Sequence, residues 1–133
     1  MKLFSEIIIE VMPDRFLFTW DTDHIEMETI INFEPNTYKL LSTGKPIGTN
    51  NGVSVNLFSN NPPFKIDVDK AELLNTFMQT VIGKLAAKKR FLILRPIVIY
   101  KGDESLSSIL CGYQRALLTA AAIAGGARAA KFE

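Results

Sequence analysis

The residues best suited to chemistry in this sequence are one histidine and a few carboxylates, and each has a simpler structural role. His24, the only histidine, lies beside Asp21 and Asp23, so the three could act as a general base or as part of a metal site. Aspartates spaced in this way are also typical of a turn between two strands. Because one histidine and two turn aspartates make an incomplete site, we interpret this segment as a solvated hairpin turn.

The other polar residues lack the partners that catalysis needs. Glu26 and Glu28 lie on one side of a predicted strand, but no acid or base accompanies them, so we expect them to face water. Asp67 and Asp69 could bind a cation, although the position of Asp69 is better explained as the cap of a helix. Three serines lie at the start of the second predicted helix, and we interpret them as helix-entry residues in preference to nucleophiles (Ser105, Ser107 and Ser108). We therefore predict no catalytic residue and no metal site.

Length and composition favour one small globular domain. The 133 residues suit a single hydrophobic core, here a domain spanning 1–133, and 47% hydrophobic with 22% charged residues argues against disorder. The formal net charge of +1 gives no support for nucleic-acid binding. Cys111 is the only cysteine, so no internal disulfide forms, and we expect a buried thiol in the cytoplasm. We find neither a secretory signal nor an apolar run long enough to cross a bilayer.

The first half of the chain reads as an antiparallel meander. The β-branched run within 5–11 predicts a buried strand, and the turn Met12-Pro13-Asp14 follows it. The next strand, 15–20, alternates so that its aromatic residues share one face, and a third strand is predicted over 24–33. Residues 37–42 could extend the meander, and the stretch 53–58 is ambiguous.

The second half alternates helices and strands. Asp69 and Glu72 form a capping-box pattern before a helix whose apolar residues continue to Leu85. A buried strand is predicted over 91–94 and 97–100, and a second helix from Leu106 to Ala121 ends at Gly125-Gly126. A last short strand fits 129–132. The fold class is therefore α/β, with a mixed sheet in which the meander is followed by helix-strand-helix-strand crossovers.

This order of elements, with several local matches, resembles the first half-domain of the bacterial actin MreB, the rod-shape-determining family. The stretch from Ile7 to Trp20 looks like the family's opening strand, phosphate turn and second strand, and 30–45 resembles the stretch that ends in "TGKxxxxGK". The segment from Asp67 resembles the helix after "DGVIADF", 89–96 the "KPRVVIxVP" strand, and 114–128 the "ERRA…AGAR" helix. The resemblance implies an actin-like ATPase half-domain of ribonuclease H-like topology.

The resemblance also implies that the phosphate-binding turn is degenerate. In the actin fold a first hairpin of the form "DxGTxxT" meets the metal and the phosphates of the nucleotide. The matching positions here are Glu10, Met12, Pro13 and Phe16. Glu10 keeps a carboxylate, whereas the other three replace a glycine and two hydroxyl residues. The chain ends at Glu133, before the family's "IEEP" segment, second phosphate loop and adenosine site, so we expect no nucleotide cofactor.

The loop before the "KPRVV" strand departs from the family pattern as well. Where the family often carries an apolar pair that dips into the membrane, this chain has Lys88, Lys89 and Arg90. These cations suit the end of a helix, and they could also contact anionic lipid or an acidic partner. We expect membrane insertion to be absent and peripheral contact to be at most a minor role. An insertion of about ten residues after Pro96 also sets this chain apart from the family.

Three hypotheses follow from the sequence. The first is a non-catalytic actin-like module that acts through protein contacts, with a homodimer or another protein covering its exposed face. The second is an ATP-binding half-site completed in trans by a partner chain, with Glu10 coordinating magnesium. The third is an unrelated small α/β domain that binds a ligand or a peptide, since fold by itself does not establish function.

Overall fold

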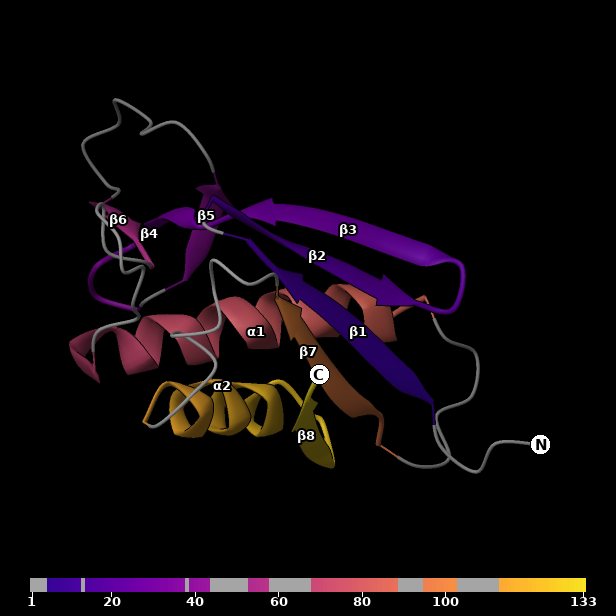
Figure 1. Cartoon of the computed structure of the whole chain (residues 1–133). Helices are drawn as coiled ribbons and strands as arrows, with labels where there is room; N and C mark the ends of the chain where they lie inside the picture. Colours follow the sequence, from indigo (N-terminus) through magenta and orange to yellow (C-terminus); the bar gives the residue numbers. More distant parts are fainter. Residues whose placement is uncertain are drawn as a thin grey trace.

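The computed structural model describes residues 5–12, 14–37, 39–43, 53–57, 68–88, 95–102 and 113–133. Within these ranges the chain forms strands, a short 3₁₀ turn η1 (Val68–Lys70) and two α-helices, α1 (Ala71–Ala86) and α2 (Tyr113–Ala124). The strands are β1 (Glu6–Val11), β2 (Arg15–Trp20), β3 (Asp23–Glu28), β4 (Ile30–Phe33), β5 (Leu40–Thr43), β6 (Val53–Asn56), β7 (Ile97–Gly102) and β8 (Ala129–Phe132). Figure 1 shows the main sheet in front of the two helices.

The main sheet has five strands in the order β3-β2-β1-β7-β8. β1 pairs antiparallel with β2 and parallel with β7, and β8 continues the parallel half. Parallel strands need a long crossover, and here the connection from β7 to β8 contains α2. The mixed sheet with its antiparallel meander and helical crossovers confirms the fold class expected from the sequence.

The third predicted strand is split in two. Instead of one strand over 24–33, β3 ends at Glu28 and pairs with β2, while β4 begins at Ile30 and lies between β5 and β6 in a separate three-stranded sheet. The break occurs at Thr29, which is buried. Its N–H donates to the carbonyl of Asp14 at 3.0 Å, and its carbonyl accepts from the N–H of Leu57 at 2.9 Å. The first bond continues the register of β2 with β3, and the second continues the register of β4 with β6, so the chain passes from one sheet to the other at Thr29.

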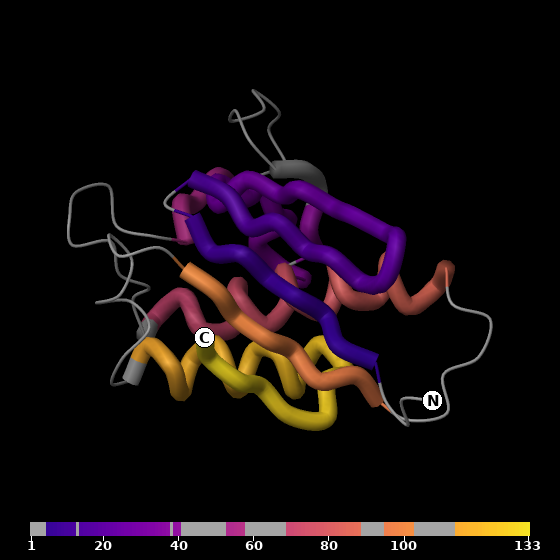
Figure 2. Tube along the Cα trace, turned by 45° about the vertical axis from the view of Figure 1, so that its right-hand side comes forward, coloured from indigo at the N-terminus to yellow at the C-terminus, as the bar shows by residue number. Residues whose placement is uncertain are grey.

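Both helices pack on one face of the main sheet, and the two views agree on this arrangement (Figures 1 and 2). α1 runs over the expected residues, with its apolar positions buried, but the predicted capping box is wrong. The residue before the helix is Lys70, whose side chain does not cap it, and Asp69 lies within η1. The amine of Lys70 instead donates to the carbonyl of Asn56 at 2.8 Å, which ties η1 to β6. The predicted strand over 91–94 and the predicted helical residues 106–112 lie outside the described residues, as does Cys111.

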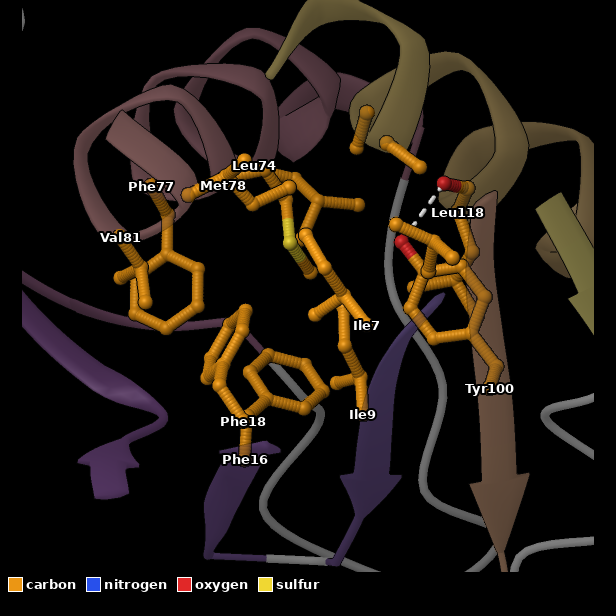
Figure 3. Close-up of a cluster of buried hydrophobic side chains, with 14 of the residues drawn as sticks. Ile7, Ile9, Phe16, Phe18, Leu74, Phe77, Met78, Val81, Tyr100 and Leu118 are labelled. Carbon is orange, nitrogen blue, oxygen red and sulfur yellow. Dashed lines mark hydrogen bonds between the residues drawn. The ribbon is translucent and has the colours of Figure 1, made fainter. Parts of the chain in front are cut away.

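The core lies between the main sheet and the helices. The three aromatic residues of β2 alternate inward and are fully buried, as their spacing predicts. Figure 3 shows Phe16 and Phe18 pointing at Phe77 of α1, and the ring centroids lie 5.4 Å and 6.0 Å from that of Phe77. On β7, the hydroxyl of Tyr100 donates to the carbonyl of Leu118 in α2 at 2.8 Å, so the polar end of this buried ring is satisfied (Figure 3).

The second helix ends where the glycine pair predicts. α2 stops at Ala124, and Gly126 has a φ of 110°, a value that side-chain-bearing residues rarely adopt. Gly125 serves a different purpose, since a Cβ built there would lie 2.8 Å from Cδ1 of Ile82 and 3.1 Å from the carbonyl oxygen of Met78. The absence of a side chain at Gly125 therefore lets the end of α2 approach α1 closely.

Candidate functional site

The hairpin that carries the candidate phosphate turn is tight. β1 and β2 pair in register up to Val11 and Phe16, and the N–H of Met12 then donates to the carbonyl of Arg15 at 2.9 Å. The next carbonyl, that of Asp14, accepts from Thr29. Pro13 lies outside the described residues. The amide of Met12 is thus committed to the hairpin itself, where a phosphate-binding turn would direct such donors at its ligand.

The three described residues of the candidate turn, Glu10, Met12 and Phe16, do not meet at one place. Phe16 is fully buried and faces α1, so it belongs to the core and lies on the opposite side of the sheet from an exposed neighbour such as Glu10 (Figure 3). Strand alternation explains this separation. Along β1 the buried, inward-facing residues alternate with Glu6, Ile8 and Glu10, which face outward. Both glutamates are exposed. Of the predicted positions, Glu10 and Met12 are the two that the structure brings together.

Glu10 and Met12 line an open pocket of about 350 Å³ together with Val11, Lys101 and Gly102. The pocket lies at the carboxyl ends of β1 and β7, where Glu10 is the register partner of Lys101. These two strands run parallel, whereas β1 and β2 run antiparallel. The pocket therefore lies beside the point where the direction of the sheet changes, and at the strand ends where α/β folds commonly place ligands.

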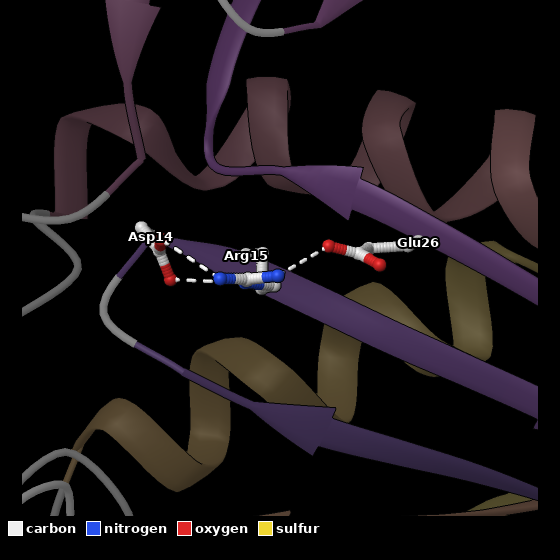
Figure 4. A network of polar contacts seen from close by, with 3 residues as sticks. All are labelled: Asp14, Arg15 and Glu26. Atoms are coloured by element: carbon white, nitrogen blue, oxygen red, sulfur yellow. Dashed lines mark hydrogen bonds and ion pairs between the residues drawn. The ribbon is translucent and has the colours of Figure 1, made fainter.

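The cations around this pocket are already paired with carboxylates. Figure 4 shows the guanidinium of Arg15 between Asp14 and Glu26, with Arg15 Nε 3.3 Å from Asp14 Oδ1. The hydrogen bond that the Arg15 side chain donates to Glu26, followed by its bonds to Asp14, raises the pKa of Arg15. Lys101 Nζ lies 3.8 Å from Glu133 Oε2. Each of these two described cations therefore already has a carboxylate beside it.

The basic residues of the helix end lie elsewhere. Lys88 is exposed just after α1, and its N–H donates to the carbonyl of Leu85, while Lys89 and Arg90 lie outside the described residues. α1 ends toward the amino ends of β1 and β7, opposite to the pocket (Figures 1 and 2). None of the described helices is long and apolar enough to cross a membrane.

The turn that carries the histidine behaves as a hairpin turn. Asp21 has a φ of 55°, which aspartate tolerates better than most residues, and Asp23 begins β3. Nδ1 of His24 lies 3.2 Å from the hydroxyl of Thr19, its register partner. Across the part of the chain that the structure describes, no three His, Cys, Asp or Glu side chains are placed to share a metal ion.

Sequence reasoning missed Lys101 and Gly102. The strand was predicted to end at Tyr100, with the next residues in a turn. In the structure β7 continues to Gly102. The parallel register that places Lys101 beside Glu10 connects segments about ninety residues apart, and no local pattern reports it. The general preference of ligands for the carboxyl ends of parallel strands was the one available signal.

The sheet order and the two crossover helices define the fold of an actin-like half-domain. Among solved structures, the chain is similar to MreB5 of Spiroplasma citri bound to AMPPNP, with a TM-score of 0.70 and 12% identity over 100% of this chain. The same protein bound to ADP gives 0.68 and 13% identity over 98% of this chain. At such identities the likeness shows the fold alone. The chain spans 39% and 38% of the lengths of these two structures. No protein-family profile matches the sequence, and no curated protein is significantly similar to it.

Proposed function

We propose that this chain is a non-catalytic, MreB-like module of the cytoplasm that acts through protein contacts, in cell-shape or cytoskeletal organisation. The observation that carries the proposal is the position of Phe16, which is fully buried against Phe77 where the resemblance places a hydroxyl residue of the phosphate turn. The fold is that of an actin-like half-domain, and Met12 and Pro13 stand where the resemblance places a glycine and a second hydroxyl residue. A protein that keeps such a fold without the nucleotide chemistry retains a scaffold for association.

Nucleotide binding tests this proposal directly. Isothermal titration calorimetry with Mg·AMPPNP should give no measurable heat of binding to the purified chain. Phosphate would have to approach the carboxylates of Glu10, Asp14, Glu26 and Glu133, and two cations beside them, Arg15 and Lys101, already lie next to carboxylates. Saturable binding at micromolar affinity would overturn the proposal. Sedimentation at increasing protein concentration tests the homodimer, and a strict monomer with no captured partner would count against a role in protein contacts.

A second candidate is an ATP-binding half-site that a partner chain completes in trans. It is favoured by the carboxylate of Glu10, which lines a pocket at the end of β1, and by the AMPPNP and ADP that the two MreB5 structures hold. Under this alternative Glu10 would coordinate magnesium. Calorimetry with Mg·AMPPNP in the presence of a captured partner distinguishes the two candidates, since only the half-site predicts that the partner restores binding.

A further inference from the structure

Both described helices lie on one face of the main sheet, and no described element covers its opposite face at the central strands β1 and β7 (Figures 1 and 2). Because the Tyr100 side chain points to α2, its neighbours Ile99 and Lys101 point to this outer face. In the parallel register of the two strands, Ile8 lies beside Ile99. Two residues further along, Glu10 lies beside Lys101. The outer face therefore has an apolar pair in its middle and two opposite charges side by side in the next row.

This arrangement is complementary to itself. A two-fold axis along the strands, midway between β1 and β7, places β1 of one copy over β7 of a second copy. Because register partners lie at the same level, Ile8 then faces Ile99 of the second copy. At the next row, Glu10 faces Lys101 of the second copy. A two-fold axis across the strands at Ile8 would instead bring Glu10 over Glu6, so the register favours the first axis.

The two charges remain able to make this contact. Glu10 is exposed, and the Lys101 side chain is 45% exposed. Lys101 Nζ lies 3.8 Å from Oε2 of Glu133, which is itself 58% exposed, and an exposed ion pair of this kind contributes little in water. An ammonium group has three donors, so Lys101 can approach a second carboxylate without leaving the first.

The outer face has the size of a weak interface. A sheet of five strands about 4.8 Å apart, with strands of about six residues, covers roughly 500 Å². Two such faces together bury on the order of 1,000 Å², which lies at the low end for a specific interface. Sheets that pack face to face lie about 10 Å apart with interdigitated side chains, a separation that an isoleucine on each side can fill.

We propose that this outer face binds the same face of a second copy of the chain about the two-fold axis along the strands. The apolar contact is Ile8 on Ile99, and the polar contact is Glu10 with Lys101, each made twice by symmetry. A partner of one charge sign would meet a like charge at either Glu10 or Lys101, whereas a second copy meets opposite charges at both. The inference rests on the proposed function, because it names the partner and the surface of the protein contact.

The test is sedimentation equilibrium of two charge-reversed variants, alone and mixed, at low ionic strength. Glu10→Lys brings two ammonium groups together at both polar contacts, and Lys101→Glu brings two carboxylates together. Each variant alone should therefore dimerise about tenfold more weakly than the parent. An equimolar mixture should dimerise as the parent does, because each polar contact then joins an ammonium group to a carboxylate. Circular dichroism checks the fold of each variant, and an unfolded variant could not give this recovery.

Glu6→Lys is the matched control for the mixture. Glu6 is exposed on the same face of β1, and its reversal changes the net charge equally, but its register partner is Ile97. Mixed with Lys101→Glu, the control restores only one of the two polar contacts and should dimerise more weakly than the first mixture.

Two results would overturn the inference: a parent chain that stays monomeric at millimolar concentration, or equal recovery in the two mixtures. The proposed function would still stand in either case if the chain captured another protein partner and bound no nucleotide. Saturable binding of Mg·AMPPNP, by contrast, would overturn the proposed function itself.

Discussion

The contact between the ends of α1 and α2 predicts opposite effects for two glycine-to-alanine substitutions. At Gly125, a Cβ would lie 2.8 Å from Cδ1 of the buried Ile82 and 3.1 Å from the carbonyl oxygen of Met78. Because a backbone atom cannot move aside cheaply, α2 must shift, and we expect Gly125→Ala to destabilise the fold by about 2 kcal/mol. Gly83, exposed within α1, has open space around its Cβ position, so Gly83→Ala should stabilise by up to about 1 kcal/mol.

Urea denaturation followed by circular dichroism measures both effects as shifts of the midpoint in opposite directions. A coupled substitution isolates the clash. Ile82→Val removes Cδ1, which costs about 1 kcal/mol alone but relieves part of the overlap at Gly125. The double variant Gly125→Ala/Ile82→Val should therefore lose less free energy of unfolding than the two single variants lose together. Strict additivity, or a Gly125→Ala protein as stable as the parent, would refute the close-approach argument.

Three further substitutions test the core and the hairpin. Tyr100→Phe removes the bond to Leu118 and should cost about 1 kcal/mol at neutral pH. Burial raises the pKa of Tyr100 in the folded protein above its ordinary 10.0. Above about pH 10 the tyrosine therefore ionises in the unfolded chain first, and the parent loses stability while Tyr100→Phe does not. The difference in unfolding free energy between the two proteins should accordingly shrink in urea titrations above about pH 10. Phe16→Thr, which restores a hydroxyl to the candidate turn, should destabilise by about 3 to 4 kcal/mol through lost packing on Phe77 and should not confer Mg·ATP binding in calorimetry. A stable variant that binds Mg·ATP would contradict the core position of Phe16. Arg15→Ala should leave the thermal midpoint nearly unchanged in high salt because the Arg15 network is exposed, and a loss as large as that of Phe16→Thr would contradict this interpretation.

Much of the fold follows from local periodicity. The inward alternation of Phe16, Phe18 and Trp20 predicted β2, and helical spacing predicted α1 to within a few residues. The split of the third strand at Thr29 was not predictable in the same way. The predicted strand continues through Thr29, but after Thr29 the chain leaves β2 and pairs with β6, beginning with the bond from the N–H of Leu57 to the carbonyl of Thr29. Local pattern thus identifies elements, while distant backbone partners decide which sheet they join.

The capping error has a related cause. Asp69 and Glu72 match the sequence signature of a helix start, but this signature contains no information about the contacts of the segment that precedes the helix. The bond from Lys70 to the carbonyl of Asn56 holds the preceding turn against β6, and the turn continues as η1 before the α-helix begins. A tertiary contact therefore overrides a local preference whose worth is about 1 kcal/mol.

The candidate site was half predictable. Glu10 and Met12 were identified through the resemblance to the family's first phosphate turn, and the structure places both at one pocket. The resemblance placed Phe16 in the same turn, whereas the alternation along β2 placed it on the aromatic face, and its burial confirms the alternation. Lys101 could not be found, because its position beside Glu10 depends on the parallel register of β1 and β7. Sequence reasoning therefore located the edge of the sheet that matters but not the set of side chains that meet there.

Phe16 and Glu10 lie on opposite faces of the main sheet, one in the core and the other at the pocket. The sheet is held to the helices by inward residues such as Ile9 and Phe16, which are fully buried, whereas Glu10 lies on the outer face and takes no part in that packing. We therefore expect Glu10→Gln to leave the midpoint of urea unfolding nearly unchanged and Phe16→Thr to lower it. A large loss of stability in Glu10→Gln would contradict the placement of Glu10 outside the core.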